Sequence, residues 1–393
     1  MPTRDLDVVL FGATGFTGAL TAEYLAHHAP ADLRWALAGR SAEKLAAVRD
    51  RLVAIEPALA DLELLIADVT DPDSLAAIAE RTRVVATTVG PYLAYGEPLV
   101  AACAASGTDY VDLTGESEFV DRMYVAHHET AVRTGARIVH ACGFDSIPYD
   151  LGAYFTVQQL PSDRPIALRG VVRAGGMVSG GTFHSAMTAL SRPSQSRFAA
   201  GARRSREERP EGRSSRSVRG KPRRDPVLGY WLLPLPTIDP IIVGRSGAAL
   251  PAYGPKFRYS HFAGTKTLRY AMGGAATVAA LGVAAQVKPL RSLLLGRIAP
   301  GEGPAESRRE KSWFTVDFVG EAGDRSVRTR VSGGDPGYGE TAKMLAESAM
   351  CLALDDNPDV AGQVTTAQAM GDQLLDRLQK AGISFEVVAG GKK

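Results

Sequence analysis

The sequence predicts an α/β protein with an N-terminal, doubly wound parallel sheet and a second, α+β domain. An apolar segment at 8–11 runs directly into a turn with Gly12, Gly15 and Gly18, and this turn opens a helix. Apolar strand-like segments then alternate with helical segments as far as residue 145. Alternating strands and helices form a parallel sheet covered on both faces, which is the Rossmann arrangement.

The elements of this first domain, residues 1–145, follow from hydrophobic periodicity and capping residues. We expect strands at 8–11, 33–38, 62–68, 83–89, 110–113 and 137–141, and helices at 17–28, 44–52, 73–81, 96–106 and 118–134. Ser41 is the expected N-cap of the second helix, because its hydroxyl can accept a hydrogen bond from a backbone N–H group.

The glycine-rich turn has the spacing of a dinucleotide site. Gly12 permits the tight turn, Gly15 lets backbone amides approach a pyrophosphate, and Gly18 lets the helix pack on the strand. The turn residues that we expect to contact the cofactor are Gly12, Thr14, Gly15, Phe16, Thr17 and Gly18.

The tip of the second strand indicates which dinucleotide binds. An NAD site usually carries a carboxylate there, whereas this sequence has Arg40, Ser41 and, three residues later, Lys44. A guanidinium and a hydroxyl suit a 2′-phosphate, so the sequence favours NADP(H). Asp68, at the end of the third strand, either accepts a hydrogen bond from the adenine amine or caps the turn at Asp71.

The end of the fourth strand is predicted to lie beside the nicotinamide. Val89, Gly90 and Pro91 follow a buried strand directly, and the carboxyl ends of parallel strands face the ligand. By default these residues form the wall of the cofactor site.

Composition excludes several classes of protein. The chain has 393 residues, a formal net charge of +2 and three widely separated cysteines, so it is no nucleic-acid binder by composition and has no disulfide framework. The few cysteines and the charged N-terminus, followed at once by a strand, favour the cytoplasm over secretion. The adjacent histidine pairs lack ligand spacing, so we expect no metal site.

Five motifs stand out along the chain, at 141–152, 179–182, 244–246, 253–259 and 334–343. With them the chain resembles the saccharopine dehydrogenase-like reductases, and within these the trans-acting enoyl reductases of actinobacterial lipid synthesis. The resemblance implies a Rossmann domain, a mixed-sheet substrate and dimerisation domain at 146–335, and C-terminal helices at 336–393 that return to the first domain. It implies little about the substrate.

Two segments of the second domain have unusual composition. Arg and Lys far outnumber Asp and Glu between 192 and 226, which predicts a mobile insertion too polar to pack. It would be a solvated loop, a cover over the site, or a contact for an acidic partner such as coenzyme A or a carrier protein. The apolar run at 268–295 predicts a helical hairpin that lines a lipophilic pocket, packs a homodimer or enters a bilayer surface.

The chemistry that we expect is transfer of a hydride from NADPH to the β-carbon of a conjugated alkene in a lipophilic acyl substrate, held free or on a carrier protein or synthase. The enolate that forms needs a hydrogen-bond donor, and the candidates are Tyr338, Tyr92 and His184. The turn with Ser179, Gly180, Gly181 and Thr182 either holds the substrate carbonyl or an anion, or is only a bulge or cap before a helix.

Two other functions stay open at this stage. In an imine or ketone reductase, Arg245 and Arg258 would hold a substrate carboxylate. In an accessory protein, NADPH would bind without turnover, which the lack of an identifiable acid–base pair allows.

Overall fold

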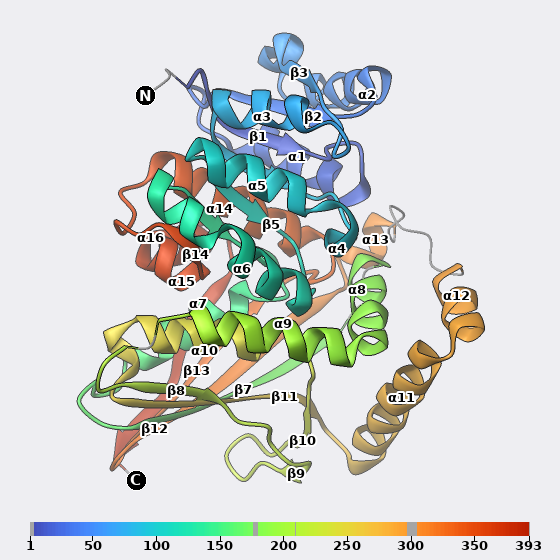
Figure 1. The fold of residues 1–393 in the computed structure, drawn as a ribbon. Helices are drawn as coiled ribbons and strands as arrows, with labels where there is room; N and C mark the ends of the chain where they lie inside the picture. The colour runs from blue at the N-terminus through green and yellow to red at the C-terminus, as the bar shows by residue number, and fades with distance from the viewer. Residues whose placement is uncertain (1–3, 176–179, 209, 297–304, 393) are drawn as a thin grey trace.

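The computed structural model describes residues 4–175, 180–208, 210–296 and 305–392. Two sheets lie one above the other, with helices around the upper sheet and between the two (Figure 1).

The first sheet is parallel throughout and has the predicted doubly wound order. Its strand order is β14-β6-β5-β4-β1-β2-β3, with the switch between β1 and β4. The strands are β1 (Leu6–Phe11), β2 (Trp35–Gly39), β3 (Glu63–Ile66), β4 (Thr82–Thr87), β5 (Asp109–Asp112), β6 (Arg137–Val139) and β14 (Gly362–Val364). The sequence analysis identified the first six strands but missed β14, which extends the sheet from the far end of the chain.

Helices cover both faces of this sheet. They are α1 (Phe16–His28), α2 (Ala42–Val53), α3 (Pro72–Arg81), α4 (Tyr92–Tyr95), α5 (Glu97–Ser106) and α6 (Ser117–Thr134), with a 3-10 turn η1 (Pro57–Asp61). Side chains alternate along β1, so Val8 and Leu10 pack in the core that includes α1 and α2, while Val9 and Phe11 pack in the core with α3 and α5. A strand buried on both faces needs a nearly continuous apolar run, which β1 has from Val8 to Phe11, and the buried Asp7 before it pairs with Arg34 at 2.7 Å.

The C-terminal region returns to the first domain, as the resemblance implied. Its helices are α14 (Gly339–Leu354), α15 (Thr366–Ala369) and α16 (Gly371–Lys380). Helix α14 is buried along most of its length and packs against α1, β1, β4 and β5. The start of α14 is thereby held near the glycine-rich turn.

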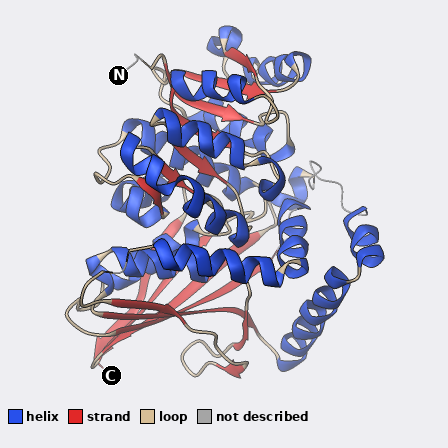
Figure 2. Ribbon diagram, in the orientation of Figure 1, coloured by secondary structure: helices blue, strands red, loops and turns tan. Residues whose placement is uncertain are grey.

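The second sheet is mixed and lies below the first (Figure 2). Its strands are β7 (Ile166–Gly175), β8 (Ser214–Ser217), β9 (Arg223–Arg224), β10 (Trp231–Pro234), β11 (Lys256–Thr265), β12 (Trp313–Ala322), β13 (Arg325–Gly333) and β15 (Ser384–Lys392). Helices α7 (Ile147–Val157) and α10 (Asp239–Ala249) lie between the sheets, with η2 (Pro251–Tyr253) and α13 (Glu306–Arg309) in the connections. Since β14 joins one sheet and β15 the other, the C-terminal region belongs to both domains.

The prediction that 192–226 is too polar to pack was wrong. Residues 193–206 form α9 (Pro193–Arg206), which lies along α6, and β8 and β9 join the second sheet. Arg203 is buried, and its Nε lies 2.5 Å from Oδ1 of the buried Asp121 on α6. Arg192 pairs with Glu118 on the same helix at 2.7 Å. The basic side chains thus meet carboxylates that are far away in the sequence.

The predicted hairpin at 268–295 was also wrong. Helix α11 (Leu268–Gln286) is followed by α12 (Lys288–Gly296), which continues beyond its end rather than folding back along it (Figure 1). Helix α11 contacts α8 (Gly180–Ser191), where Gln286 Nε2 donates to the Leu190 carbonyl at 2.5 Å. By length and composition α11 could cross a membrane, and only 17% of its apolar window is buried.

Candidate functional site

The glycine-rich turn has a shape that only glycine permits at two of its positions. Gly12 has a φ of 92°, in the left-handed region. A Cβ on Gly18 would lie 2.2 Å from the carbonyl oxygen of Gly12, which is far inside van der Waals contact. Helix α1 begins directly after Gly15, and no side chain caps its first N–H groups. These amides are therefore arranged to meet the pyrophosphate of a dinucleotide.

The end of β4 packs against this turn. Thr88 Oγ1 donates a hydrogen bond to the Gly12 carbonyl at 3.1 Å, and a Cβ on Gly12 would lie 2.7 Å from Val89 Cγ2. The Gly90–Pro91 peptide bond that follows is cis. Val89 thus borders the glycine-rich turn, and the role of Val89, Gly90 and Pro91 as the wall beside the nicotinamide stays a prediction.

The adenosine end carries an exposed guanidinium. Arg40 follows β2 directly, its side chain is 78% exposed, and its Nε lies 3.9 Å from Asp68 Oδ2. Ser41 caps α2 by accepting a hydrogen bond from the Lys44 backbone N–H group at 3.3 Å. Arg40 can therefore turn toward a 2′-phosphate while giving up only a long, solvent-exposed ion pair.

Asp68 shapes the turn after β3. Its Oδ1 accepts hydrogen bonds from Thr70 N at 2.9 Å and Thr70 Oγ1 at 2.8 Å. These bonds hold the pKa of the Asp68 carboxyl below its usual range. The neighbouring Asp71 caps α3. Asp68 thus stabilises the turn, and its hydrogen bond to the adenine amine stays a prediction.

The structure brings Tyr338, Gly180 and the glycine-rich turn together, although they are far apart in the sequence. The Tyr338 ring meets the Phe16 ring edge to face, with centroids 4.9 Å apart. Gly180 N, at the start of α8, donates to the Tyr338 hydroxyl at 3.3 Å. Gly181 and His184 follow on α8, whereas Ser179 lies outside the described residues and the Thr182 side chain is not described.

Tyr92 does not suit the role of a donor to substrate. Its hydroxyl donates to the Thr87 carbonyl at 3.1 Å and accepts from Leu113 N at 3.1 Å, so both bonds of the hydroxyl go to backbone. Burial also raises the pKa of this phenol well above its usual value. Tyr92 therefore ties the ends of β4 and β5 together.

The two arginines proposed to hold a carboxylate lie apart from this group. Arg245 is buried on α10, where Nε pairs with Glu207 at 2.7 Å and Nη2 donates to the Gln363 carbonyl at 2.9 Å. Arg258 is exposed on β11, opposite Arg216 of β8. The bonds of Arg245 hold α10 to β14 and to the segment after α9, so the structure does not favour a carboxylate clamp.

Comparison with known proteins agrees with this geometry. The model of the saccharopine dehydrogenase NADP-binding domain matches residues 8–139. A protein of Mycobacterium tuberculosis that carries a trans-acting enoyl reductase name is 40% identical over 98% of this chain and 97% of its own. The trans-acting enoyl reductase of Mycobacterium bovis is 38% identical, with 97% of each chain covered. This chain belongs to the trans-acting enoyl reductase family.

This chain has the fold of a saccharopine dehydrogenase. The L-glutamate-forming enzyme of Saccharomyces cerevisiae superposes with a TM-score of 0.55 at 14% identity, covering 98% of this chain and 100% of that enzyme. The match to an NADP-binding domain and the exposed Arg40 agree on the cofactor, which is NADP(H). The chain is thus an NADP-dependent oxidoreductase of the enoyl reductase family.

Two carboxylates near the site were missed by sequence reasoning. Glu116, after β5, is buried and accepts hydrogen bonds from Tyr92 N and Leu93 N, each at 3.0 Å. Asp145, after β6, lies next to Gly115 and Ser185. The signal was present, since both follow strands whose carboxyl ends face the ligand.

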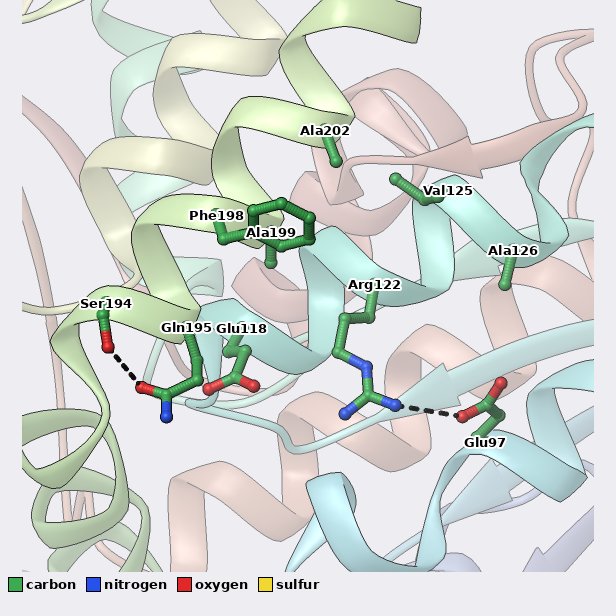
Figure 3. A pocket seen from close by; sticks show the side chains of 10 residues that line it. All are labelled: Glu97, Glu118, Arg122, Val125, Ala126, Ser194, Gln195, Phe198, Ala199 and Ala202. Carbon is green, nitrogen blue, oxygen red and sulfur yellow. Dashed lines mark hydrogen bonds and ion pairs between the residues drawn. The ribbon is translucent and has the colours of Figure 1, made fainter.

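A surface pocket of about 630 Å³ lies elsewhere, between α5, α6 and α9 (Figure 3). Its lining includes the Arg122–Glu97 ion pair and the exposed ring of Phe198, and it includes no residue of the glycine-rich turn or of the start of α14. The pocket is therefore separate from the cofactor site.

Proposed function

We propose that this protein reduces the carbon–carbon double bond of an α,β-unsaturated, lipophilic acyl substrate. The observation that carries the proposal is the contact of Tyr338 with both Phe16 of the cofactor turn and Gly180 of α8. This contact supports the proposal because a phenol and the start of a helix meet the glycine-rich turn in a chain related to enoyl reductases.

The residues around Tyr338 fit the demands of this reaction. NADPH, when bound, supplies a hydride to the β-carbon, and negative charge then develops on the substrate carbonyl oxygen. Tyr338 is the donor that we propose for this oxygen. Its hydroxyl accepts a hydrogen bond from Gly180 N, and accepting one bond strengthens a hydroxyl as a donor. Gly181 and His184 belong to the same proposed substrate-binding segment.

The lipophilic character of the substrate is supported by α11. Tyr270, Met272 and Val283 of this helix are 73%, 64% and 65% exposed, and α11 packs on α8, which begins at Gly180. An apolar surface thus connects to the helix that opens at the proposed site.

We also propose that α11 and α12 contact an anionic bilayer surface from the cytoplasm. Lys288 and Arg291 lie on α12 with the exposed Leu290 and Leu293, and no acidic residue occurs between Asp239 and Glu302. Basic residues beside exposed apolar ones favour anionic lipid surfaces. A carrier-protein or synthase partner and a homodimer stay predictions of the sequence.

The test of the reaction uses NADPH deuterated at either face of C4 and the N-acetylcysteamine thioester of trans-2-dodecenoic acid. We expect deuterium from one face at the β-carbon of the saturated product, detected by mass spectrometry. An imine or ketone reductase would leave this thioester unchanged and would place label on a carbon bearing nitrogen or oxygen in suitable substrates. NADPH binding without label in any product would favour an accessory protein.

A further inference from the structure

Asp145 lies at the carboxyl edge of the first sheet, in the loop between β6 and α7. A Cβ on Gly115 would lie 3.1 Å from Asp145 Oδ2 and 3.9 Å from Ser185 Cβ, so these three residues meet at one point. Asp145 as a whole residue is half-buried, and its carboxyl is poorly hydrated.

Hydrogen bonds connect this point to the predicted nicotinamide wall. Ser185 Oγ donates to Glu116 Oε1 at 3.3 Å, and the same carboxylate accepts from Tyr92 N and Leu93 N, directly after Pro91. The surroundings of Asp145 are thereby fixed relative to the end of β4.

The opposite side of the loop is held by α14. Phe144 N donates to Thr341 Oγ1 at 3.2 Å, and Thr341 follows Tyr338 by three residues. Asp145 thus lies between the segment after β4 and the helix start that carries the proposed donor to the carbonyl oxygen.

The Asp145 carboxyl differs from the other carboxyls around it because it makes no hydrogen bond or ion pair in the part of the chain that the structure describes. Asp112 accepts from Ala141 N and Thr114 N, and Asp150 accepts from Ser246, Thr366 and Ala367. A carboxylate without partners is costly in poorly hydrated surroundings, whereas a carboxylic acid is not. The site therefore favours a carboxyl that holds a proton.

We propose that Asp145 is the acid that protonates the α-carbon of the substrate. This inference rests on the proposed function, which supplies the hydride to the β-carbon. As the enolate collapses, a C–H bond forms at the α-carbon and the O–H bond of Asp145 breaks, leaving its carboxylate. Solvent returns a proton to the carboxylate after the saturated product leaves.

Burial raises the pKa of the Asp145 carboxyl to about 6. Burial, and to a smaller extent the charge of Asp145, raise the pKa of the Tyr149 phenol well above its usual value. The same two causes raise the pKa of the Asp239 carboxyl well above its usual range. The titratable groups on the surrounding elements are Glu116 after β5, Tyr149 on α7, His184 on α8, Asp239 on α10, His261 on β11, and Tyr338, Glu340 and Lys343 of α14. Lys343, the cation among them, pairs with Glu340 at 2.8 Å.

The test compares wild type with Asp145→Asn, using NADPH and the trans-2-dodecenoyl thioester. We expect kcat to fall at least about a hundredfold, in line with the loss of a general acid, while the Kd for NADPH is unchanged. Because the acid must be protonated, wild-type kcat falls as the pH rises through about 6. Asp145→Glu should recover part of kcat and keep a pH dependence, which Asp145→Asn should lose. The control is Asp163→Asn, in an exposed loop.

Each outcome decides the inference. Loss of kcat and of the pH dependence, with NADPH binding retained, supports it. An Asp145→Asn variant with wild-type kcat or the wild-type pH profile overturns it and leaves the proposed function standing. If wild type itself binds NADPH but reduces no enoyl thioester, the proposed function fails and the inference fails with it.

Discussion

Replacing Gly18 by alanine tests whether the turn around Gly12 determines cofactor binding. The added Cβ would lie 2.2 Å from the Gly12 carbonyl oxygen, whereas ordinary contacts begin at 3.4 Å, so turn and helix must separate by about 1.2 Å. Overpacking of this kind typically costs about 1–3 kcal/mol of unfolding free energy. The same displacement moves the amides that would face the pyrophosphate, so we expect NADPH affinity to be lost as well.

Gly15→Ala is the matched comparison for this variant. Its Cβ would lie 3.5 Å from the same carbonyl oxygen, an ordinary contact, so we expect the unfolding free energy to change little. The new methyl would still stand where the pyrophosphate must approach, so NADPH affinity should fall. Urea unfolding gives the stability, and quenching of protein fluorescence by NADPH gives the Kd. A Gly18→Ala protein with wild-type stability and wild-type Kd would refute this account of the turn.

Three further predictions concern specificity, membrane contact and the packing of α9. Arg40→Ala should weaken NADPH about 10–100-fold and leave NADH unchanged in binding titrations, since one exposed charged hydrogen-bonding group is lost; equal losses for both would contradict the 2′-phosphate role. Val283→Asp should lower the fraction of protein that sediments with anionic phospholipid vesicles, whereas Phe198→Asp, at an exposed site on α9, should not. Equal effects of the two substitutions would indicate nonspecific hydrophobic binding instead of contact through α11. Arg203→Met should lower the unfolding free energy, measured with urea, by about 3–5 kcal/mol, because Asp121 stays buried without its partner. Adding Asp121→Asn to this variant should restore part of the lost stability. An unchanged urea midpoint in Arg203→Met would contradict a structural ion pair.

The first sheet could be predicted because its signals are local. The strands β1 to β6 each have apolar residues at their centres, as expected for parallel strands that are buried on both faces. β14 escaped prediction because its three residues, Gly362 to Val364, include one large apolar side chain and so form no apolar run. Its place beside β6 depends on the return of the C-terminal region to the first domain.

The segment at 192–226 was misjudged because composition reports what a segment would do alone. Arg203 is buried only because α6 presents Asp121 to it, and the two residues lie far apart in the sequence. Similarly, the apolar pattern of α11 indicated a helix but not the direction in which α12 continues.

The sequence by itself determined the cofactor turn, because the turn is local. Gly12 adopts a positive φ, and Gly18 leaves room for the Gly12 carbonyl oxygen only six residues away. Only the tertiary structure decided which polar side chains near that turn are available for chemistry. The Tyr92 hydroxyl bonds to the Thr87 carbonyl and the Leu113 amide, whereas the Asp145 carboxyl has no such partner among the described residues. Hydrogen-bond partners come from strands and helices that meet only when the sheets assemble, so a side chain's role depends on the folded chain.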